Sequence, residues 1–156
     1  MIPNDKAFNG KSFFECDGKK FQRWFSINQT GSFNLEFKII SVNSSNRQGI
    51  ALFFSDFIGT IYLNGTPLKV LKGFKHYLFK DEDIINNKLT LSLSVENGGI
   101  FFGNASEDKS IPMFRSGSFG CAFWIEELTE NHLRFHCNDH EYDDDFDDFI
   151  FDMIYC

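Results

Sequence analysis

A strict alternation of apolar and polar residues is the feature that most constrains the fold of this chain. Every second residue from Phe33 to Ile39 is apolar, and the residues between them are Asn, Glu and Lys. Residues 88–96 repeat the pattern, with Leu and Val alternating with Lys, Thr, Ser and Glu. A period of two is the side-chain period of a strand that buries one face. The two segments therefore predict strands that share a core.

Most of the remaining chain consists of short apolar or alternating runs separated by turn residues. These runs predict further strands at residues 21–27, 50–54, 59–63, 68–71, 100–103, 120–126, 133–137 and 149–155. In the predicted strand 133–137, Leu133, Phe135 and Cys137 face the core, and Arg134 and His136 face outward. In all, the pattern indicates roughly nine to eleven strands by the usual strand and turn signals.

Two glycine-containing turns predict hairpins. Asn64-Gly65 separates the runs 59–63 and 68–71, and Asn97-Gly98-Gly99 separates the runs 88–96 and 100–103. Asn and Gly are favoured in two-residue hairpin turns because both central positions need positive φ. Residues 104–118 are expected to form a polar loop with Phe114 and Arg115 near its tip. At most one helical turn is expected, at 80–85 or 125–131.

The composition supports the same fold class. The chain has 156 residues, which is one ordinary domain (1–156), and 21 of them are Phe. Aromatic residues fit a half-buried pleated surface, and the many Asn and Gly residues supply turns. We therefore predict an all-β fold, a two-sheet antiparallel β-sandwich of jelly-roll type.

The acidity of the chain is concentrated at its C-terminal end. The net charge is -7, and residues 139–156 contain 8 acids without a Lys or Arg, so the rest of the chain is close to neutral. This acidic strip, residues 139–148, has three interpretations. It is a solvated loop, a surface for a basic protein partner, or a Ca²⁺ site. The candidate calcium ligands are Asp139, Asp143, Asp145 and Asp147, although the strip lacks the EF-hand pattern.

The histidines next to the strip suggest zinc only at first sight. His132, His136, Cys137 and His140 are potential ligands of this metal. In a strand, however, four residues span roughly 13 Å, and consecutive residues point to opposite faces. One metal ion cannot gather such side chains, so a solvent-facing strand surface is the better interpretation.

Several classes of partner and location are disfavoured. The sequence has no run of roughly 20 apolar residues, as a membrane helix needs, and no apolar signal-peptide core at its start. We therefore expect a cytoplasmic protein that does not bind membranes. The negative charge and the lack of a basic stripe argue against nucleic acid. The widely spaced cysteines predict free thiols, with Cys121 and Cys137 on core faces.

The order of several segments resembles the concanavalin A-like lectin/glucanase superfamily over about residues 30–155. The segments are GSFNLEFKII, GIALFF, KLTLSLSVENGGIFFG, GSFGCAFWIEE, LRFHCND and FDDFIFDMI. The resemblance implies a jelly-roll sandwich that binds carbohydrate. The glucanase strand with Glu-x-Asp-x-x-Glu and the galectin His/Asn/Arg strand are both missing, so the resemblance implies binding without catalysis.

Trp124 is the best candidate for a sugar-stacking platform, because Phe123 and Ile125 are predicted to take the core face. Arg115, His136 and Asn138 are the candidates for hydrogen bonds to the sugar. The alternative is that Trp124 packs under a loop.

The leading hypothesis is thus a non-catalytic, lectin-like carbohydrate-binding module. The alternative is a cytosolic protein-interaction module, of inhibitor or immunity type, that offers the acidic strip to a basic partner. The third is a glycoside-active enzyme, which would need two carboxylates about 5 to 9 Å apart.

Overall fold

A computed structural model describes residues 13–68, 76–79, 84–108, 113–116, 121–138 and 146–156. These residues contain no helix, and therefore none long and apolar enough to cross a membrane. The strands, in chain order, are β1 (Phe13–Cys16), β2 (Lys19–Gln22), β3 (Phe25–Ile27), β4 (Gly31–Val42), β5 (Gln48–Leu63), β6 (Thr66–Pro67), β7 (His76–Phe79), β8 (Lys88–Asp108), β9 (Met113–Ser116), β10 (Ala122–Thr129), β11 (His132–Asn138) and β12 (Phe149–Tyr155).

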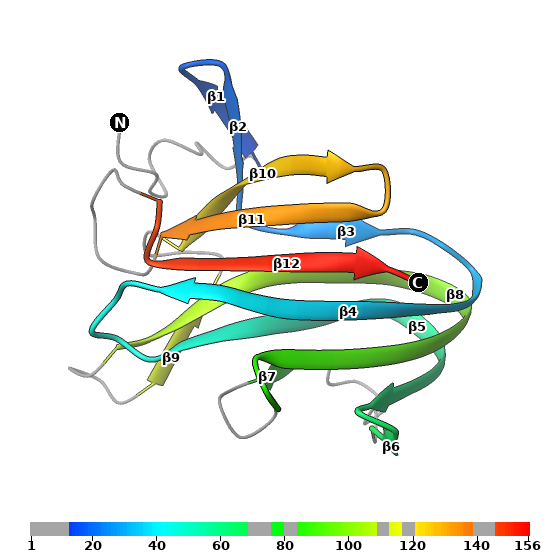
Figure 1. Cartoon of the computed structure of the whole chain (residues 1–156). Helices are drawn as coiled ribbons and strands as arrows, with labels where there is room; N and C mark the ends of the chain where they lie inside the picture. The colour runs from blue at the N-terminus through cyan, green and yellow to red at the C-terminus, as the bar shows by residue number, and fades with distance from the viewer. Residues whose placement is uncertain (1–12, 69–75, 80–83, 109–112, 117–120, 139–145) are drawn as a thin grey trace.

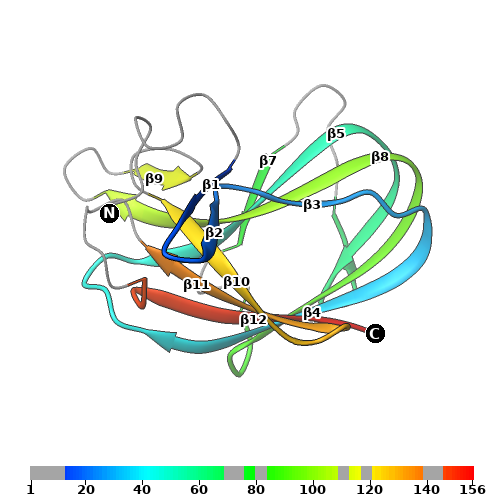
Figure 2. The ribbon, with the colours of Figure 1, turned by 90° about the horizontal axis from the view of Figure 1, so that it is seen from above.

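All these strands belong to one antiparallel hydrogen-bonded sheet. Its order is β1-β2-β10-β11-β12-β4-β8-β5-β6, while β3 and β9 also pair with β8 and β7 pairs with β5. The sheet is folded over on itself (Figures 1 and 2), with β10, β11, β12 and β4 in one layer and β3, β9 and the adjoining halves of β5 and β8 opposite. The all-β prediction is confirmed. The prediction of a jelly roll with two separate sheets is not confirmed, because one hydrogen-bonded network runs through both layers.

The long strands β5 and β8 carry the sheet from one layer to the other. The early part of β8 pairs with β4, and its later part, from Ile100 to Phe102, pairs with β3. Figure 2 shows both β5 and β8 curving around one side of the molecule. Their continuity fixes how the layers face each other.

The predicted hairpin at residues 97–99 is wrong, because β8 continues through it. Gly98 has a φ of 95°, and a Cβ atom there would lie 2.5 Å from the carbonyl oxygen of Asp56. Opposite this point the register of β5 shifts between Ser55 and Ile58. The glycine pair therefore permits a bend and a bulge across from a neighbouring strand, instead of a chain reversal.

Other predicted elements were partly right. The Asn64-Gly65 turn is confirmed, with positive φ at both residues, and it leads into β6. The predicted strands 50–54 and 59–63 are one strand, β5. The predicted polar loop 104–118 contains the end of β8 and all of β9. The possible helical turn at 125–131 is wrong because residues 122–129 form β10. The other possible turn, at 80–85, lies mostly outside the described residues.

The core lies between the two layers and is rich in phenylalanine. The Phe37 and Phe102 rings, from β4 and β8, have centroids 5.1 Å apart, and both side chains are fully buried. Phe25 on β3 meets Phe135 on β11 edge-to-face at 5.7 Å. Phe135 also stacks on Phe151 at 4.6 Å. The Phe37–Phe102 and Phe25–Phe135 contacts join the two layers, and the Phe135–Phe151 contact joins neighbouring strands of one layer.

Candidate functional site

A pocket opens at the end of the fold where the chain passes from β4 to β5. β4 pairs with β8 only as far as Lys38, and the Ile39 amide then donates to the Asn87 carbonyl at 2.8 Å. Beyond this point no described residue pairs with β4 on its β8 side, and residues 43–47 lead to the start of β5. We call the resulting cavity, of about 500 Å³, the end pocket. Its lining residues are Ile39, Val42, Ser44, Ser45, Asn46, Arg47, Gln48, Ile84, Asn87 and Phe149.

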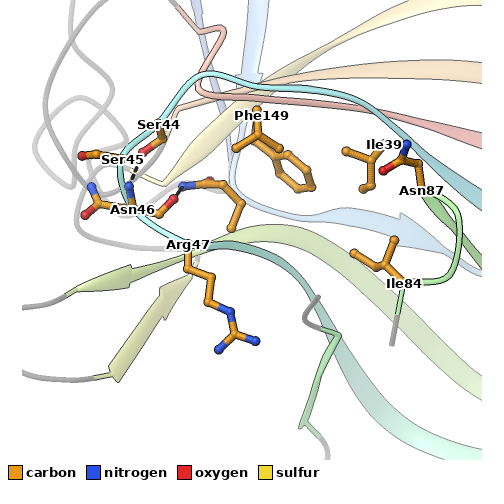
Figure 3. Close-up of a pocket in the computed structure, with 10 residues that line it drawn as sticks. Ile39, Ser44, Ser45, Asn46, Arg47, Ile84, Asn87 and Phe149 are labelled. Atoms are coloured by element: carbon orange, nitrogen blue, oxygen red, sulfur yellow. Dashed lines mark hydrogen bonds between the residues drawn. The ribbon is translucent and has the colours of Figure 1, made fainter. Parts of the chain in front are cut away.

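The two sides of the end pocket differ in chemistry. Figure 3 shows the loop residues Ser44–Asn46 on one side, Ile39, Ile84 and Asn87 on the other, and the Phe149 ring between them. Val42, which also lines the pocket, is 50% exposed. The pocket thus combines an incompletely covered apolar wall with hydroxyl and amide groups. Its size and mixture of groups are typical of small-ligand sites.

Hydrogen bonds to distant parts of the chain hold both ends of the loop 43–47. The Asn43 amide donates to the Asp148 carbonyl at 2.9 Å, and the Asn43 side chain donates to the Asp147 carbonyl at 3.2 Å. At the other end, the Glu107 amide donates to the Arg47 carbonyl at 2.8 Å. Within the loop, the Ser44 hydroxyl accepts a hydrogen bond from the Asn46 amide at 3.0 Å. This contact forms a tight turn of a kind that serine favours.

A two-residue turn holds the opposite wall of the pocket. Ile85 and Lys88 form an antiparallel bridge, and the residues between them, Asn86 and Asn87, have φ values of 51° and 61°. Asn tolerates this left-handed conformation better than most residues. The turn places Ile84 and Asn87 at the pocket.

Gln48 is a buried polar residue in the pocket wall. It is 5% exposed, and its Nε2 donates to the Asn46 carbonyl at 2.9 Å. Its Oε1 is enclosed and has no hydrogen-bond partner. An unpaired buried acceptor costs free energy, and such atoms are rare in folded proteins. Asn104 shows the same imbalance, since its Nδ2 donates to the Asn138 carbonyl while its Oδ1 has no partner.

The structure brings together two of the predicted sugar-binding residues. Trp124 on β10 and His136 on β11 are paired across the strands, and their rings stack 4.0 Å apart and nearly parallel. Lys19 on β2, the strand on the other side of β10, places its Nζ 4.3 Å from the indole centroid. Trp124 therefore has neighbours from both flanking strands over its ring. Trp124 and Lys19 line a groove of about 410 Å³ together with Gln22 and Phe25.

The other predicted sugar-binding residues lie elsewhere. Asn138 is fully buried, and its Oδ1 accepts a hydrogen bond from the Phe146 amide at 3.1 Å, so its side chain supports the chain after residue 145. Arg115 is on β9, opposite Ser106, but its side chain lies outside what the structure describes.

The outward face of β11 carries an ionic cluster. Arg134 lies on this face, as the alternation of the strand predicts. Arg134 Nε and His132 Nε2 lie 2.8 and 2.6 Å from the two carboxylate oxygens of Asp152, which is 2% exposed. Burial alone would raise the pKa of Asp152, but the hydrogen bonds from Arg134 and His132 outweigh it, so this pKa is lowered. His136 pairs separately with Glu126, at 3.0 Å. His132 and His136 therefore contact different carboxylates, those of Asp152 and Glu126.

Most of the proposed calcium site lies outside the described residues, including Asp139, Asp143 and Asp145. Asp147 is half-buried, and the adjacent Asp148 is 5% exposed. This end of the acidic strip is folded against the domain. Within the described part of the chain, no three His, Cys, Asp or Glu residues are grouped to hold a metal ion.

The cysteines on the core faces behave as predicted. Cys121 and Cys137 are free and buried, and Cys156 is free and exposed. Burial, reinforced by the neighbouring Cys121 and Asp148, raises the pKa of the Cys137 thiol well above its usual value. A buried thiol with a raised pKa is a poor nucleophile.

Sequence reasoning missed the end pocket. One signal was available, because the alternation of β4 ends at the adjacent apolar pair Ile39-Ile40, where the pairing with β12 has a bulge. A second was Gln48, a polar residue two positions before the apolar run 50–54 of β5. Neither signal reveals that the turn at 85–88 lies across from the loop.

Comparison with known proteins gives no relative from which a function could be transferred: the chain matches no family model, no curated protein and no solved structure.

Proposed function

We propose that this chain is a non-catalytic β-sandwich module that binds carbohydrate in the end pocket. The observation that carries the proposal is the lining of the pocket, in which amide and hydroxyl side chains surround an apolar wall that includes Phe149. A sugar presents hydroxyl groups that both donate and accept hydrogen bonds, and C–H surfaces that pack on apolar groups. Asn87, which is exposed at the pocket, supplies both kinds of hydrogen-bonding group through its amide.

The charges of the lining support binding in preference to hydrolysis. Among the described residues that line the end pocket, Arg47 is the one cation and none carries a carboxylate. Glycoside hydrolysis ordinarily requires a pair of carboxylic acids on either side of the bond that is cleaved.

The proposal includes a sandwich of the concanavalin A-like type, and the arrangement of the layers is compatible with it. The layer β10-β11-β12-β4 faces the layer formed by β3 with the adjoining halves of β8 and β5, and phenylalanines fill the space between them. Two packed antiparallel layers with an intervening core are the architecture of sandwiches. A ligand that binds at the end of such a fold contacts the loops that connect its strands.

The end pocket is a better sugar site than Trp124. A pyranose stacks on an open aromatic face, and the indole of Trp124 is already in contact with His136 and Lys19. A sugar would have to displace one of them. The wall of the end pocket is accessible, since half of the Val42 surface remains exposed.

The experiment is a glycan-array screen of the intact chain, with calcium and again with chelator. A blocking variant, Val42→Trp, fills the pocket from its apolar wall. Its matched control is Ile40→Trp, because Ile40 is also exposed on β4, at 40%, and does not line the pocket. We expect binding to a defined glycan that Val42→Trp abolishes and Ile40→Trp retains.

Two results would contradict the proposal. Binding that survives Val42→Trp would remove the end pocket as the site. A negative array in both buffers would remove carbohydrate as the ligand, and a basic protein partner for the acidic strip would then be the proposal to test. Association with such a partner should weaken steeply as salt is added.

A further inference from the structure

The geometry points to the edge of β10 after Trp124 as a binding site for an extended, basic peptide of a partner protein, which adds to the sheet as a further strand. This site shares no lining residue with the end pocket. Three features support it: a sheet edge without a described neighbour, an apolar groove beside that edge, and a separation of charges along it.

The edge begins where β2 leaves β10. β2 pairs with β10 only at Phe123 and Trp124, although β10 continues to Thr129. Figure 1 shows the β1-β2 hairpin projecting away from the layer instead of following β10. No described residue pairs with residues 125–129 on this side, whereas β11 pairs with the other side of β10 as far as Thr129. The backbone N–H and C=O groups of such an edge are a template for an added strand.

An apolar groove lies beside the same edge. Ile125 on β10, Leu133 on β11 and Phe25 on β3 line the groove of about 410 Å³, and all three are only partly buried against the core. Every second side chain of a strand added to β10 would point toward them. An apolar side chain opposite Ile125 would therefore complete the burial of these residues.

The charges of the edge favour a basic strand over a second copy of this chain. Residues 121–131 contain Glu126, Glu127 and Glu130 and no Lys or Arg. Glu126 contacts His136, whereas Glu127 and Glu130 are exposed and have no ion-pair partner among the described residues. Antiparallel pairing of two β10 edges would bring the glutamates of both copies together, which is destabilising. A strand that carries Lys or Arg would instead form favourable pairs with them.

The separation of charges in the groove indicates the direction of the peptide. Lys19 and Lys20 line the groove from β2, at its Trp124 end. Glu127 lines it three residues further along β10, roughly 10 Å from Trp124. β10 is antiparallel to both of its neighbours, and an antiparallel peptide passes Glu127 before it reaches Ile125 and the lysines. We therefore expect a Lys or Arg followed two residues later by a large apolar residue.

The test is fluorescence anisotropy on the full chain with a labelled peptide, acetyl-Thr-Lys-Thr-Lys-Thr-Val-Thr-amide. We expect binding that weakens as salt is added, and that is at least about fivefold weaker when both lysines of the peptide are replaced by Glu. Methylation of alternate backbone nitrogens distinguishes strand addition from charge attraction, because only every second N–H of an added strand faces its neighbour. Methylation in one phase should abolish binding, and methylation in the other phase should retain it.

A charge reversal at the edge tests the site itself. Glu127→Lys, at an exposed position, should weaken binding of the lysine peptide at least about fivefold and strengthen binding of its Glu counterpart. The matched control is Glu96→Lys, because Glu96 is also an exposed glutamate on a strand and does not line the groove. Val42→Trp, which fills the end pocket, should likewise retain peptide binding, so the peptide site and the sugar site are tested separately.

Three results would overturn the inference. Binding of the lysine peptide that survives Glu127→Lys would remove the β10 edge as the site. Equal binding of the two methylated peptides would show that no strand is added. If the lysine peptide does not bind and the chain sediments as a dimer, the edge belongs to a second copy, and if it does not bind to a monomer, the edge is not a peptide site.

Discussion

Asp152 and Arg134 form a two-point contact on the outward face of the sheet. Arg134 Nε lies 2.8 Å from one carboxylate oxygen and its second nitrogen 3.1 Å from the other, while His132 shares the second oxygen at 2.6 Å. The carboxylate is almost fully buried, whereas the side chains of Arg134 and His132 are each 31% exposed. The pair therefore fixes β12 to β11 at a position where an unpaired carboxylate would be costly.

Replacing the carboxylate should destabilise the fold. Asp152→Asn keeps the shape of the side chain but loses the charge-assisted hydrogen bonds, and we expect the free energy of unfolding to fall by about 1.5 to 3 kcal/mol. Urea denaturation measures this change. The control is Glu36→Gln, which removes a looser contact with Lys88 at 3.8 Å on the neighbouring strand and should change stability by less than about 1 kcal/mol. Equal losses in the two variants would contradict the special role of Asp152.

The same contact predicts an acid-dependent loss of stability. The pKa of Asp152 is lower in the folded chain than its ordinary value of 3.8, so the unfolded chain binds the proton more readily. The stabilisation is fully present above this ordinary value and is lost as the pH falls through the lower folded value. The difference in unfolding free energy between the native chain and Asp152→Asn should therefore be constant from pH 7 to about 5 and shrink below about 4. A difference that is unchanged at pH 3 would show that the contact does not depend on the charge of Asp152.

Two glycines with the same φ should respond differently to substitution. Gly98 and Gly31 both have a φ of 95°, but an added Cβ at Gly98 meets the carbonyls of Asp56 and Ser55 at 2.5 Å, and one at Gly31 meets nothing within 4 Å. Gly31→Ala should cost only the backbone strain, about 1 to 2 kcal/mol. Gly98→Ala adds the collision with β5 and should cost clearly more. Thermal unfolding of both variants measures the gap, and equal melting temperatures would mean that the bend accommodates a side chain.

The glycine bend shows where sequence reasoning about the fold succeeds and where it ends. The alternation of β4 and the early part of β8 correctly predicted which side chains enter the core, because side-chain period is a local property of a strand. Asn64-Gly65 was likewise sufficient for its hairpin. The glycines at 98 and 99 carry the same local signal, but the approach of Asp56 from a distant part of the chain turns them into a bend.

The candidate site was harder to predict for the same reason. Trp124 and His136 come together because β10 and β11 are consecutive antiparallel strands, which the sequence already suggested. The end pocket lies between the loop 43–47 and the turn at 85–88, and no local pattern specifies how far apart these two segments lie. The occupation of the Trp124 ring by Lys19 depends on the pairing of β2 with β10, across about a hundred residues of sequence.

Lys19 should control the exposure of Trp124. Its Nζ lies 4.3 Å from the indole centroid, so Lys19→Ala should uncover the ring and increase its quenching by acrylamide. Lys20→Ala is the matched control, because Lys20 lies 4.4 Å from the Phe13 ring instead. The second tryptophan, Trp24, packs edge-on against Phe53 at 4.4 Å and contributes the same background to both variants. If quenching rises equally in the two variants, or in neither, Lys19 does not cover the indole in solution. Trp124 would then become available again as a sugar-stacking surface in competition with the end pocket.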